Sequence, residues 1–400
     1  MHRGDTIAIA VVLGTAICTA SAWLAAGPLD PTLPQHITVG QPSGPAPMER
    51  LSPDRGGRSI VAFPTQPRVL WRVRVMGSPQ RAIAVDARGA VVVASDTHLT
   101  QISADGKVEW KVRLGPTRAA SAPIITSSGA RWLLTSDGDL LGVDRDGRTL
   151  WRQTLPVTSA KPAGQMLPTS DGGAVVPVGS EVFRLESDGR VRTRIALDEM
   201  VSSVIQNGAD LLLVGVAGGV FRWKPPVAVT PLGSLGGRPE GSAALADPNT
   251  LIAVVDGNRL MEMDLRSGSR RARVPDGTYM FYGSPAITAR GETRVFSSDG
   301  FLLGHNAKGE ETWRVALTAG DQRDAGTATT TAGRPAPLVV DHSGAVAFVA
   351  GGLELGVASK SGKVSTVSGA ACATPVSLVP AGKHRLALAC VSGLVWMIGS

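Results

Sequence analysis

The sequence predicts an all-β fold, an eight-bladed β-propeller of four-stranded antiparallel blades, and three observations carry this prediction. Past residue 68 almost every apolar run is four to seven residues long and ends at Gly, Asp, Asn or Ser, which is typical of strands and tight turns. A unit of about 42 residues recurs eight times. Three turns divide each unit, and three hairpin turns separate four strands.

The repeat is clearest where DGDLLGVDRDGRTLW at 137–151 is matched by DGFLLGHNAKGEETW at 299–313. Each unit opens with a small or polar residue that usually precedes a proline. The opening and the three turns of the second unit are Ala122-Pro123, Ser128-Gly129, Asp137-Gly138 and Asp146-Gly147. The opening and the first two turns occur eight times but the third only seven times, so the eighth unit lacks its last strand.

The missing strand is expected at the other end of the repeat region. PRVLWRVRV at 67–75 matches the fourth strands at 108–114 and 149–155. We therefore expect Val69 to Val75 to pair as the outermost strand of the blade that contains Thr374 to Ser400. Such closure leaves no exposed sheet edge between the first and last units.

The unit endings GVDRDGRTLW (142–151), QISADGKVEW (101–110) and GHNAKGEETW (304–313) resemble the quinoprotein-type eight-bladed β-propeller with PQQ-like repeats, over the whole of 68–400. The resemblance implies that this motif docks blades. The residues expected to pack between neighbouring blades are Trp71, Trp110, Trp151 and Trp313. Asp144 and Asp146 are expected to shape a turn, because a calcium loop formed by these two with Asp137 and Asp139 does not have the required spacing.

Enzymes of this superfamily oxidise alcohols or sugars with pyrroloquinoline quinone (PQQ) and calcium. This chain has no adjacent cysteine pair, no C-x-x-C-H haem site, no G-x-S-x-G and no H-E-x-x-H motif. No catalytic, cofactor-binding or metal-binding residue is therefore predicted. The histidines nearest to turns or strand ends, His98, His305, His342 and His384, are expected to be solvated or hydrogen-bonded for structural reasons.

The leading functional hypothesis is a non-catalytic exported propeller that binds a protein or polymer at the cell envelope. Its nearest non-enzymatic analogue is the propeller lipoprotein of the outer-membrane β-barrel assembly machinery, and the likeness is architectural. A PQQ-dependent oxidoreductase and a carbohydrate-binding or sensing propeller are the alternatives. Fold alone does not decide between them, because one fold hosts many functions.

Three segments are expected. Residues 1–26 are an export signal, either a cleaved signal peptide or an uncleaved membrane anchor with its apolar part at 7–26. Cys18 allows a lipid anchor, although Ile17 before it is not the small residue of a lipobox. Residues 27–67 hold nine prolines and are expected to form an extended linker, and 68–400 form the propeller in the periplasm or on the extracytoplasmic face.

The net charge of +7 is spread along the chain, so no nucleic acid is implied, and a monomer is expected. The densest basic stretch, RSGSRRARV at 266–274, is interpreted as a solvated outer strand.

Cys372 and Cys390 lie nine residues on either side of Ala381, which falls in a predicted hairpin turn. We expect them to be cross-strand partners and, in an exported protein, to form a disulfide, with two buried free thiols as the alternative.

One loop suggests a place for a partner. From Trp313 to the next opening proline, Pro337, there are 24 residues, against 13 after Trp110 and 11 after Trp151. The loop is expected to rise over the face that bears the second turns at Asp137, Asp256 and Asp299. Its tip residues, Asp321, Arg323 and Asp324, are expected to contribute to partner binding.

Overall fold

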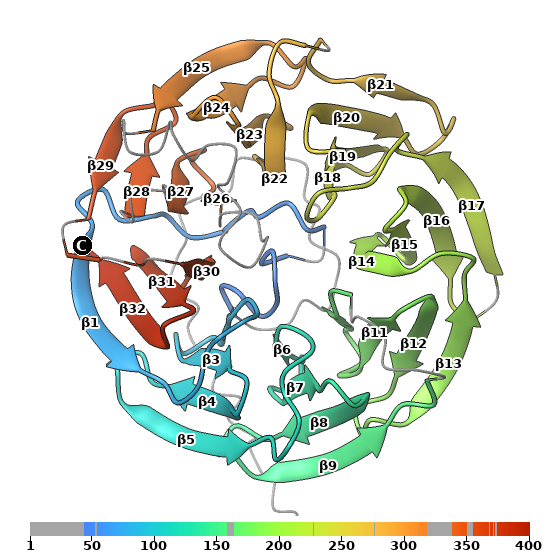
Figure 1. Cartoon of the computed structure of the whole chain (residues 1–400), viewed down its shortest axis with the longest axis vertical. Helices are drawn as coiled ribbons and strands as arrows, with labels where there is room; N and C mark the ends of the chain where they lie inside the picture. The colour runs from blue at the N-terminus through green and yellow to red at the C-terminus, as the bar shows by residue number, and fades with distance from the viewer. Residues whose placement is uncertain are drawn as a thin grey trace, which may run out of the picture. The chain divides into compact units, whose positions relative to one another are not determined.

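A computed structural model describes residues 44–400 except 53, 158–163, 227, 276, 318–337, 350–354, 368, 371 and 373. It confirms the all-β propeller: eight four-stranded antiparallel sheets surround a central axis (Figure 1). The described part of the chain contains strands and turns and no α-helix. It accordingly offers no helix with the length and apolar character needed to span a bilayer.

Each blade runs from an inner strand at the axis to an outer strand at the circumference. The first four blades contain β2 (Ala84–Val85), β3 (Val91–Ala94), β4 (His98–Ile102), β5 (Val108–Arg113); β6 (Ile124–Ile125), β7 (Arg131–Leu134), β8 (Asp139–Val143), β9 (Thr149–Thr154); β10 (Leu167–Pro168), β11 (Ala174–Val178), β12 (Glu181–Leu185), β13 (Val191–Ala196); and β14 (Val201–Asn207), β15 (Asp210–Gly215), β16 (Gly219–Lys224), β17 (Ala228–Ser234). The other four contain β18 (Ala244–Asp247), β19 (Thr250–Val255), β20 (Arg259–Asp264), β21 (Arg270–Ala272); β22 (Phe281–Ile287), β23 (Thr293–Ser297), β24 (Phe301–His305), β25 (Glu311–Ala316); β26 (Leu338–Val340), β27 (Val346–Val349), β28 (Leu355–Ala358), β29 (Val364–Thr366); and β30 (Pro375–Pro380), β31 (Arg385–Cys390), β32 (Leu394–Gly399), β1 (Arg68–Arg74).

The core lies between adjacent blades. The second strands are buried on both faces, as in β3 and β7, because each blade is covered by a neighbour on either side. The outer strands alternate between exposed and half-buried residues, as in β1 and β13. This alternation is the pattern expected of a strand with one face toward solvent and one toward protein.

The first strand closes the ring as predicted. β1 pairs antiparallel with β32, from Arg68 opposite Gly399 to Arg74 opposite Leu394. The register of this pair shifts between Val69 and Trp71. Trp151 stands next to an equivalent shift in its own blade, between Gly142 and Val143, so the two tryptophans occupy corresponding positions. The eighth blade is therefore completed by residues from both ends of the propeller.

The expectation of an extended linker over 27–67 is wrong for its described part. Residues 44–63 except 53, here called the channel segment, cross the axis of the ring, where Figure 1 shows them in blue, and leave it near Ile60, which is 71% exposed. Ala46, Met48, Leu51 and Phe63 are buried there at 0–3% exposure. The composition of the segment predicts an extended chain, but its apolar residues gain more by packing into the channel than by staying in water.

Backbone hydrogen bonding explains why the channel accepts this segment. Eight inner strands turn their unpaired edges toward the axis, and buried backbone groups need partners. Residues of the channel segment form hydrogen bonds with every blade. The Arg55 side chain donates to the carbonyls of Met166 and Val204. The other bonds run from a backbone N–H of a blade to a backbone carbonyl of the segment: Val85 to Ala46, Ile125 to Pro47, Leu245 to Asp54, Ile287 to Gly56, Val340 to Gly57 and His384 to Ala62. The segment thus supplies hydrogen-bonding partners to backbone groups of all eight blades, through its own carbonyls in six blades and through the Arg55 side chain in the third and fourth.

Candidate functional site: a pocket on the propeller axis

Arg55 holds the channel segment at the axis. Its guanidinium is completely buried and donates to four backbone carbonyls, those of Glu49 (2.6 Å), Met166 (2.7 Å), Val204 (3.0 Å) and Gln165 (3.2 Å). Burial lowers the pKa of Arg55 to about 10, while the charges of Glu49 and Asp54 oppose this shift. The side chain therefore remains a cation at neutral pH and ties the segment to two blades.

Arg50 anchors the same segment on the opposite side of the ring. It donates to the carbonyls of Leu338 (2.9 Å), Pro285 and Arg55 (3.3 Å), and burial lowers its pKa to about 10. Arg50, Leu51 and Arg55 adopt φ values of 63°, 68° and 58°, in the left-handed region that non-glycine residues rarely occupy. Such conformations persist where the surroundings hold them, and they concentrate at binding and catalytic sites.

Above the channel segment lies a pocket of about 280 Å³, lined by residues of all eight blades. Glu49, Arg50 and Leu51 form its floor. Its walls come from the beginnings of the inner strands and the residues just before them. The hydroxyl-bearing wall residues are Ser121, Ser202, Ser284 and Ser377. The walls are therefore mixed, because aliphatic residues such as Leu338, Val339 and Val379 stand beside these hydroxyl groups.

Two wall residues have unused hydrogen-bonding groups. Arg81 makes no hydrogen bond or ion pair with another described residue, and its Nε is buried without a partner. Burial lowers the pKa of Arg81, and the nearby charge of Glu49 opposes this. Gln165 donates from Nε2 to Ser242 Oγ, but its buried Oε1 accepts nothing within the described chain. A cation and an acceptor are thus available to a ligand.

The wall residues stand where the chain passes from one blade to the next, so the pocket lies on the side of the ring that carries the blade-to-blade connections and the second turns of the blades, here called the connection face. Second-turn residues donate backbone hydrogen bonds to residues of the connections: Asp96 N to Ser78 O, Val216 N to Met200 O, and Ser298 N to Met280 O. Met76, Met200 and Met280, all in such connections, are 41–57% exposed. Methionine is adaptable, and flexible exposed methionines are common on surfaces that bind protein partners.

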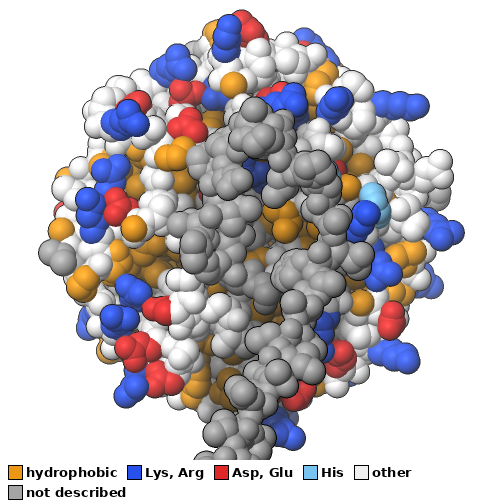
Figure 2. All heavy atoms as spheres, turned by 180° about the vertical axis from the view of Figure 1, so that it is seen from behind, with side chains coloured by type: hydrophobic (Ala, Val, Ile, Leu, Met, Phe, Trp, Pro, Cys, Tyr) orange, Lys and Arg blue, Asp and Glu red, His pale blue; other side chains and the backbone are white. Residues whose placement is uncertain are grey.

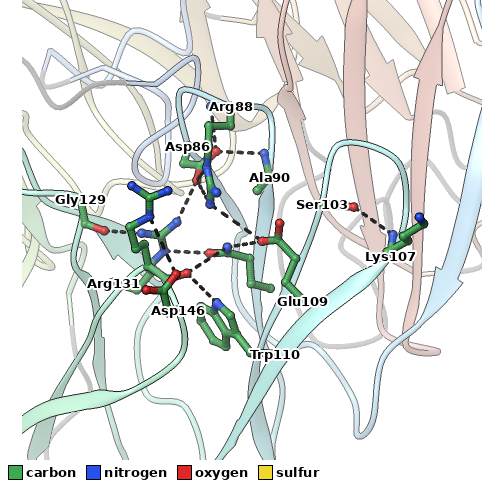
Figure 3. A network of polar contacts seen from close by, with 12 residues as sticks. Asp86, Arg88, Ala90, Ser103, Lys107, Glu109, Trp110, Gly129, Arg131 and Asp146 are labelled. Atoms are coloured by element: carbon green, nitrogen blue, oxygen red, sulfur yellow. Dashed lines mark hydrogen bonds and ion pairs between the residues drawn. The ribbon is translucent and has the colours of Figure 1, made fainter.

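A buried polar network joins the first two blades away from the axis (Figure 3). Arg131, 2% exposed, donates to Asp86 Oδ2 (2.8 Å), Gln101 Oε1 (2.8 Å) and the carbonyl of Gly129. Asp86 also accepts from the backbone N–H groups of Arg88 (2.9 Å) and Ala90 (3.0 Å). The charged groups of Asp86 and Arg131 compensate each other within the protein, so this network stabilises the blade interface.

The four predicted tryptophans each contact the next blade at the glycine of its third turn. A Cβ on those glycines would lie 2.6–3.4 Å from the indole, for the pairs Trp71 and Gly106, Trp110 and Gly147, Trp151 and Gly189, and Trp313 and Gly362. Trp71 Nε1 also donates to Ala104 O (2.8 Å) and Trp110 Nε1 to Arg145 O (2.9 Å). The glycines are required both for the positive φ of the turn and for the close approach of the ring.

The turn residues behave locally. Asp144 Oδ1 accepts the backbone N–H groups of Asp146 (2.9 Å) and Arg148 (2.8 Å), an arrangement that stabilises a tight turn. Asp139 begins β8 and Asp144 follows its end, so these carboxylates lie at opposite ends of the strand. No group of three or more metal-ligating side chains occurs within the described ranges.

The basic stretch at 266–274 is only partly a solvated strand. Arg271 is exposed and pairs with Glu262, but Arg273 is buried, binds the same carboxylate, and donates to the carbonyls of Gly291 and Asn306. Arg273 thus joins two blades. On the face that Figure 2 shows, acidic and basic side chains are intermingled, with no extended region of one sign.

His305 differs from its expectation. It is buried at the end of β24, and neither ring nitrogen has a partner among the residues that the structure describes. Burial lowers the pKa of His305 to about 4, and the charges of Arg273 and Arg294 act in the same direction. His98 and His384 match the expectation better, because each has a ring nitrogen within hydrogen-bonding distance of an oxygen.

Cys372 and Cys390 are joined by a disulfide, with their Cα atoms 5.8 Å apart and both residues buried. They are not opposite each other in the sheet, because Cys390 lies opposite Pro375 and Cys372 precedes β30. The hairpin is centred past Ala381, and a register shift follows Pro375. The predicted partner-binding residues Asp321, Arg323 and Asp324, the export segment 1–26 and Cys18 lie outside the described residues.

Sequence reasoning missed Arg50, Arg55 and Arg81. The first two stand in MERLSPDRGGR, where prolines and glycines suggest a linker, and only the apolar Met48 and Leu51 indicate burial. Arg81 lies in an ordinary unit opening, and no local pattern distinguishes it from other arginines.

A family model described as outer membrane protein assembly factor BamB matches residues 56–281 and 136–382. Among solved structures, BamB from Moraxella catarrhalis is 17% identical, with 83% of this chain and 99% of that chain covered and a TM-score of 0.61. The computationally designed protein Ika8 is 12% identical, with 84% and 99% covered and a TM-score of 0.64.

A virginiamycin B lyase from Staphylococcus aureus is 13% identical, with 82% and 98% covered and a TM-score of 0.53. These identities show a shared fold alone. No curated protein matches the chain. Because the two ranges of the family model together run from residue 56 to residue 382, the chain belongs to the family of the outer membrane protein assembly factor BamB.

Proposed function

We infer that this chain is a non-catalytic exported propeller that binds a protein of the cell envelope through its connection face. The observation that carries this inference is the exposure of Met76, Met200 and Met280, which all lie in blade-to-blade connections on one face of a closed ring. Exposed apolar side chains on one face favour association with another protein. The family supports a partner in the envelope, because its description names the assembly of outer membrane proteins.

The chemistry of the pocket supports binding over catalysis. Its described lining offers guanidinium, amide and hydroxyl groups and one carboxylate. General acid–base catalysis needs a titratable group within hydrogen-bonding reach of a reacting atom, and a nucleophile needs an adjacent base. Glu49 has no hydrogen bond to any of the described serines, so neither arrangement is assembled here.

Site-specific photocrosslinking in envelope preparations tests this function. A photoreactive residue replaces Met76, Met200 or Met280 in separate variants of the full chain. Leu150, 54% exposed on the outer strand β9, is the matched control position. We expect crosslinks to a discrete set of envelope proteins from the three methionine positions and none from position 150.

Equal crosslinking from all four positions would contradict docking through the connection face. Titration of the purified protein with PQQ and calcium tests the enzymatic alternative, and saturable binding there would contradict a non-catalytic role.

A further inference from the structure

The axis pocket and its floor carry more positive than negative charge. The carboxylate of Glu49 acts on Arg50, Arg55 and Arg81, and that of Asp54 acts on Arg50 and Arg55 only. The other carboxylate of the channel segment, Asp54, is already paired with Arg58. None of the three arginines forms an ion pair within the described chain. Because a buried charge is stable only when it is compensated, the pocket favours an anion.

Arg81 is the group that would meet this anion. Arg50 and Arg55 already donate to three and four backbone carbonyls, respectively, and both belong to the channel segment below the pocket. Arg81 stands in the wall, with no hydrogen bond to another described residue. A guanidinium binds a carboxylate through two parallel N–H···O bonds, the geometry that a wall arginine can offer to an incoming group.

We propose that the axis pocket binds the C-terminal end of a partner polypeptide, with the terminal carboxylate at Arg81 and the last backbone N–H at Gln165 Oε1. This assignment rests on the proposed function and names what the partner would insert. A peptide end carries a carboxylate and an N–H donor a few atoms apart, which are the two groups that the pocket lacks.

The shape of the pocket agrees with a chain end. A volume of about 280 Å³ is near the lower end of the range for small-molecule sites. Glu49, Arg50 and Leu51 of the channel segment line the pocket on the axis, and residues just before the inner strands line its sides. The connection face, where those residues lie, also carries the exposed methionines, which can contact the residues that precede the terminus.

Glu49 adds selectivity for a single negative charge. It lies on the floor and has no ion pair within the described chain. A second negative charge on the ligand would be repelled by this carboxylate, since like charges in a poorly solvated site are unfavourable. A monocarboxylate is therefore preferred over a dianion such as phosphate.

The test uses two tripeptide libraries with acetylated N-termini, one with free C-terminal carboxylates and one with C-terminal amides. Bound peptides are identified by mass spectrometry, and the best free-acid peptide is then measured by calorimetry against the full chain. Arg81→Met and Gln165→Leu remove the two proposed contacts. Arg118→Met is the matched control, because Arg118 is exposed on the same face outside the pocket.

We expect the free-acid library to be enriched and the selected peptide to lose at least tenfold in affinity on amidation or with Arg81→Met, because hydrogen bonds to a charged group contribute this much. Arg118→Met should bind as the parent protein does. The melting temperature of Arg81→Met should not fall below that of the parent, since Arg81 makes no hydrogen bond or ion pair with another described residue, and a fall would indicate a structural role instead.

Three results would overturn the proposal. The first is that the two libraries bind equally well or that neither binds. The second is that Arg81→Met binds the selected peptide with unchanged affinity. The third is that acetate displaces the bound peptide at the same concentration as the unlabelled peptide does. Photocrosslinking from the connection face is measured with the same variants. If it persists while the pocket fails these tests, the docking function stands and only the peptide-end site is rejected.

Discussion

The ion pair between Asp86 and Arg131 allows a quantitative test of how the blades are held together. The two side chains are 6% and 2% exposed, and their charged atoms are 2.8 Å apart. We consider Arg131→Met, which keeps an unbranched apolar side chain in place of the arginine stem and removes the charge, and Asp86→Asn, which keeps the shape of the aspartate. The double variant removes both charges.

Each single change should lower the free energy of unfolding by about 3 kcal/mol. Breaking a buried pair typically costs about 3–5 kcal/mol, because the remaining charge loses its compensation. The lower value applies here, since Asp86 keeps Arg88, whose side chain is 48% exposed, and two backbone N–H donors. The double variant should lose less than the sum of the single changes, with a coupling of about 2–3 kcal/mol.

Urea denaturation of the four proteins measures these values from the midpoints, with the slope checked for constancy. In thermal scans, about 3 kcal/mol corresponds to roughly 4 °C, from about 2.1 cal/mol/K per residue over roughly 350 residues. Arg190→Met serves as the control, because Arg190 pairs with Asp188 on the surface, where such pairs contribute about 0–1 kcal/mol. A coupling below about 0.5 kcal/mol, or a loss in Arg131→Met no larger than in Arg190→Met, would refute the argument.

Three further outcomes are expected. Trp71→Ala should lower the unfolding free energy by about 3 kcal/mol, because the indole packs on Gly106 across the blade interface that ring closure creates. A melting temperature within about 1 °C of that of the parent protein would contradict this. The pKa of His305 is about 4 in the folded protein, so between its unfolded pKa near 6.5 and pH 4 the unfolded chain binds the extra proton. Unfolding free energy should therefore fall with decreasing pH, by about 3 kcal/mol at pH 4, and an unchanged pH slope in His305→Phe would exclude this residue as the cause. Mass spectrometry of the unreduced exported protein should show Cys372 and Cys390 bonded, and Cys390→Ser should lose about 3 kcal/mol of stability; two free thiols would contradict the bond.

Much of the fold could be predicted because its signals are local. A glycine such as Gly147 takes a positive φ, an Asp such as Asp144 caps a turn, and these residues recur at the same place in each unit. Ring closure could also be predicted from the sequence, since PRVLWRVRV at 67–75 repeats the motif of the other outer strands. The contact between each of these tryptophans and a third-turn glycine involves only two neighbouring units of the repeat. In the third blade Thr193 stands in place of the tryptophan and the four-stranded sheet still forms, so a blade can form without this residue.

The number of blades, their strand order and the strand that closes the ring follow from local sequence patterns, because turn chemistry and strand alternation act over a few residues and recur. The location of residues 44–63 and the surroundings of Arg81 depend on the closed ring. The channel segment becomes ordered by eight strand edges that converge only when the ring is closed, and Arg55 meets carbonyls more than 100 positions away in the chain. The charge excess on the axis has both origins, because Glu49, Arg50 and Arg55 are close in the sequence while Arg81 is brought to them only by closure of the ring.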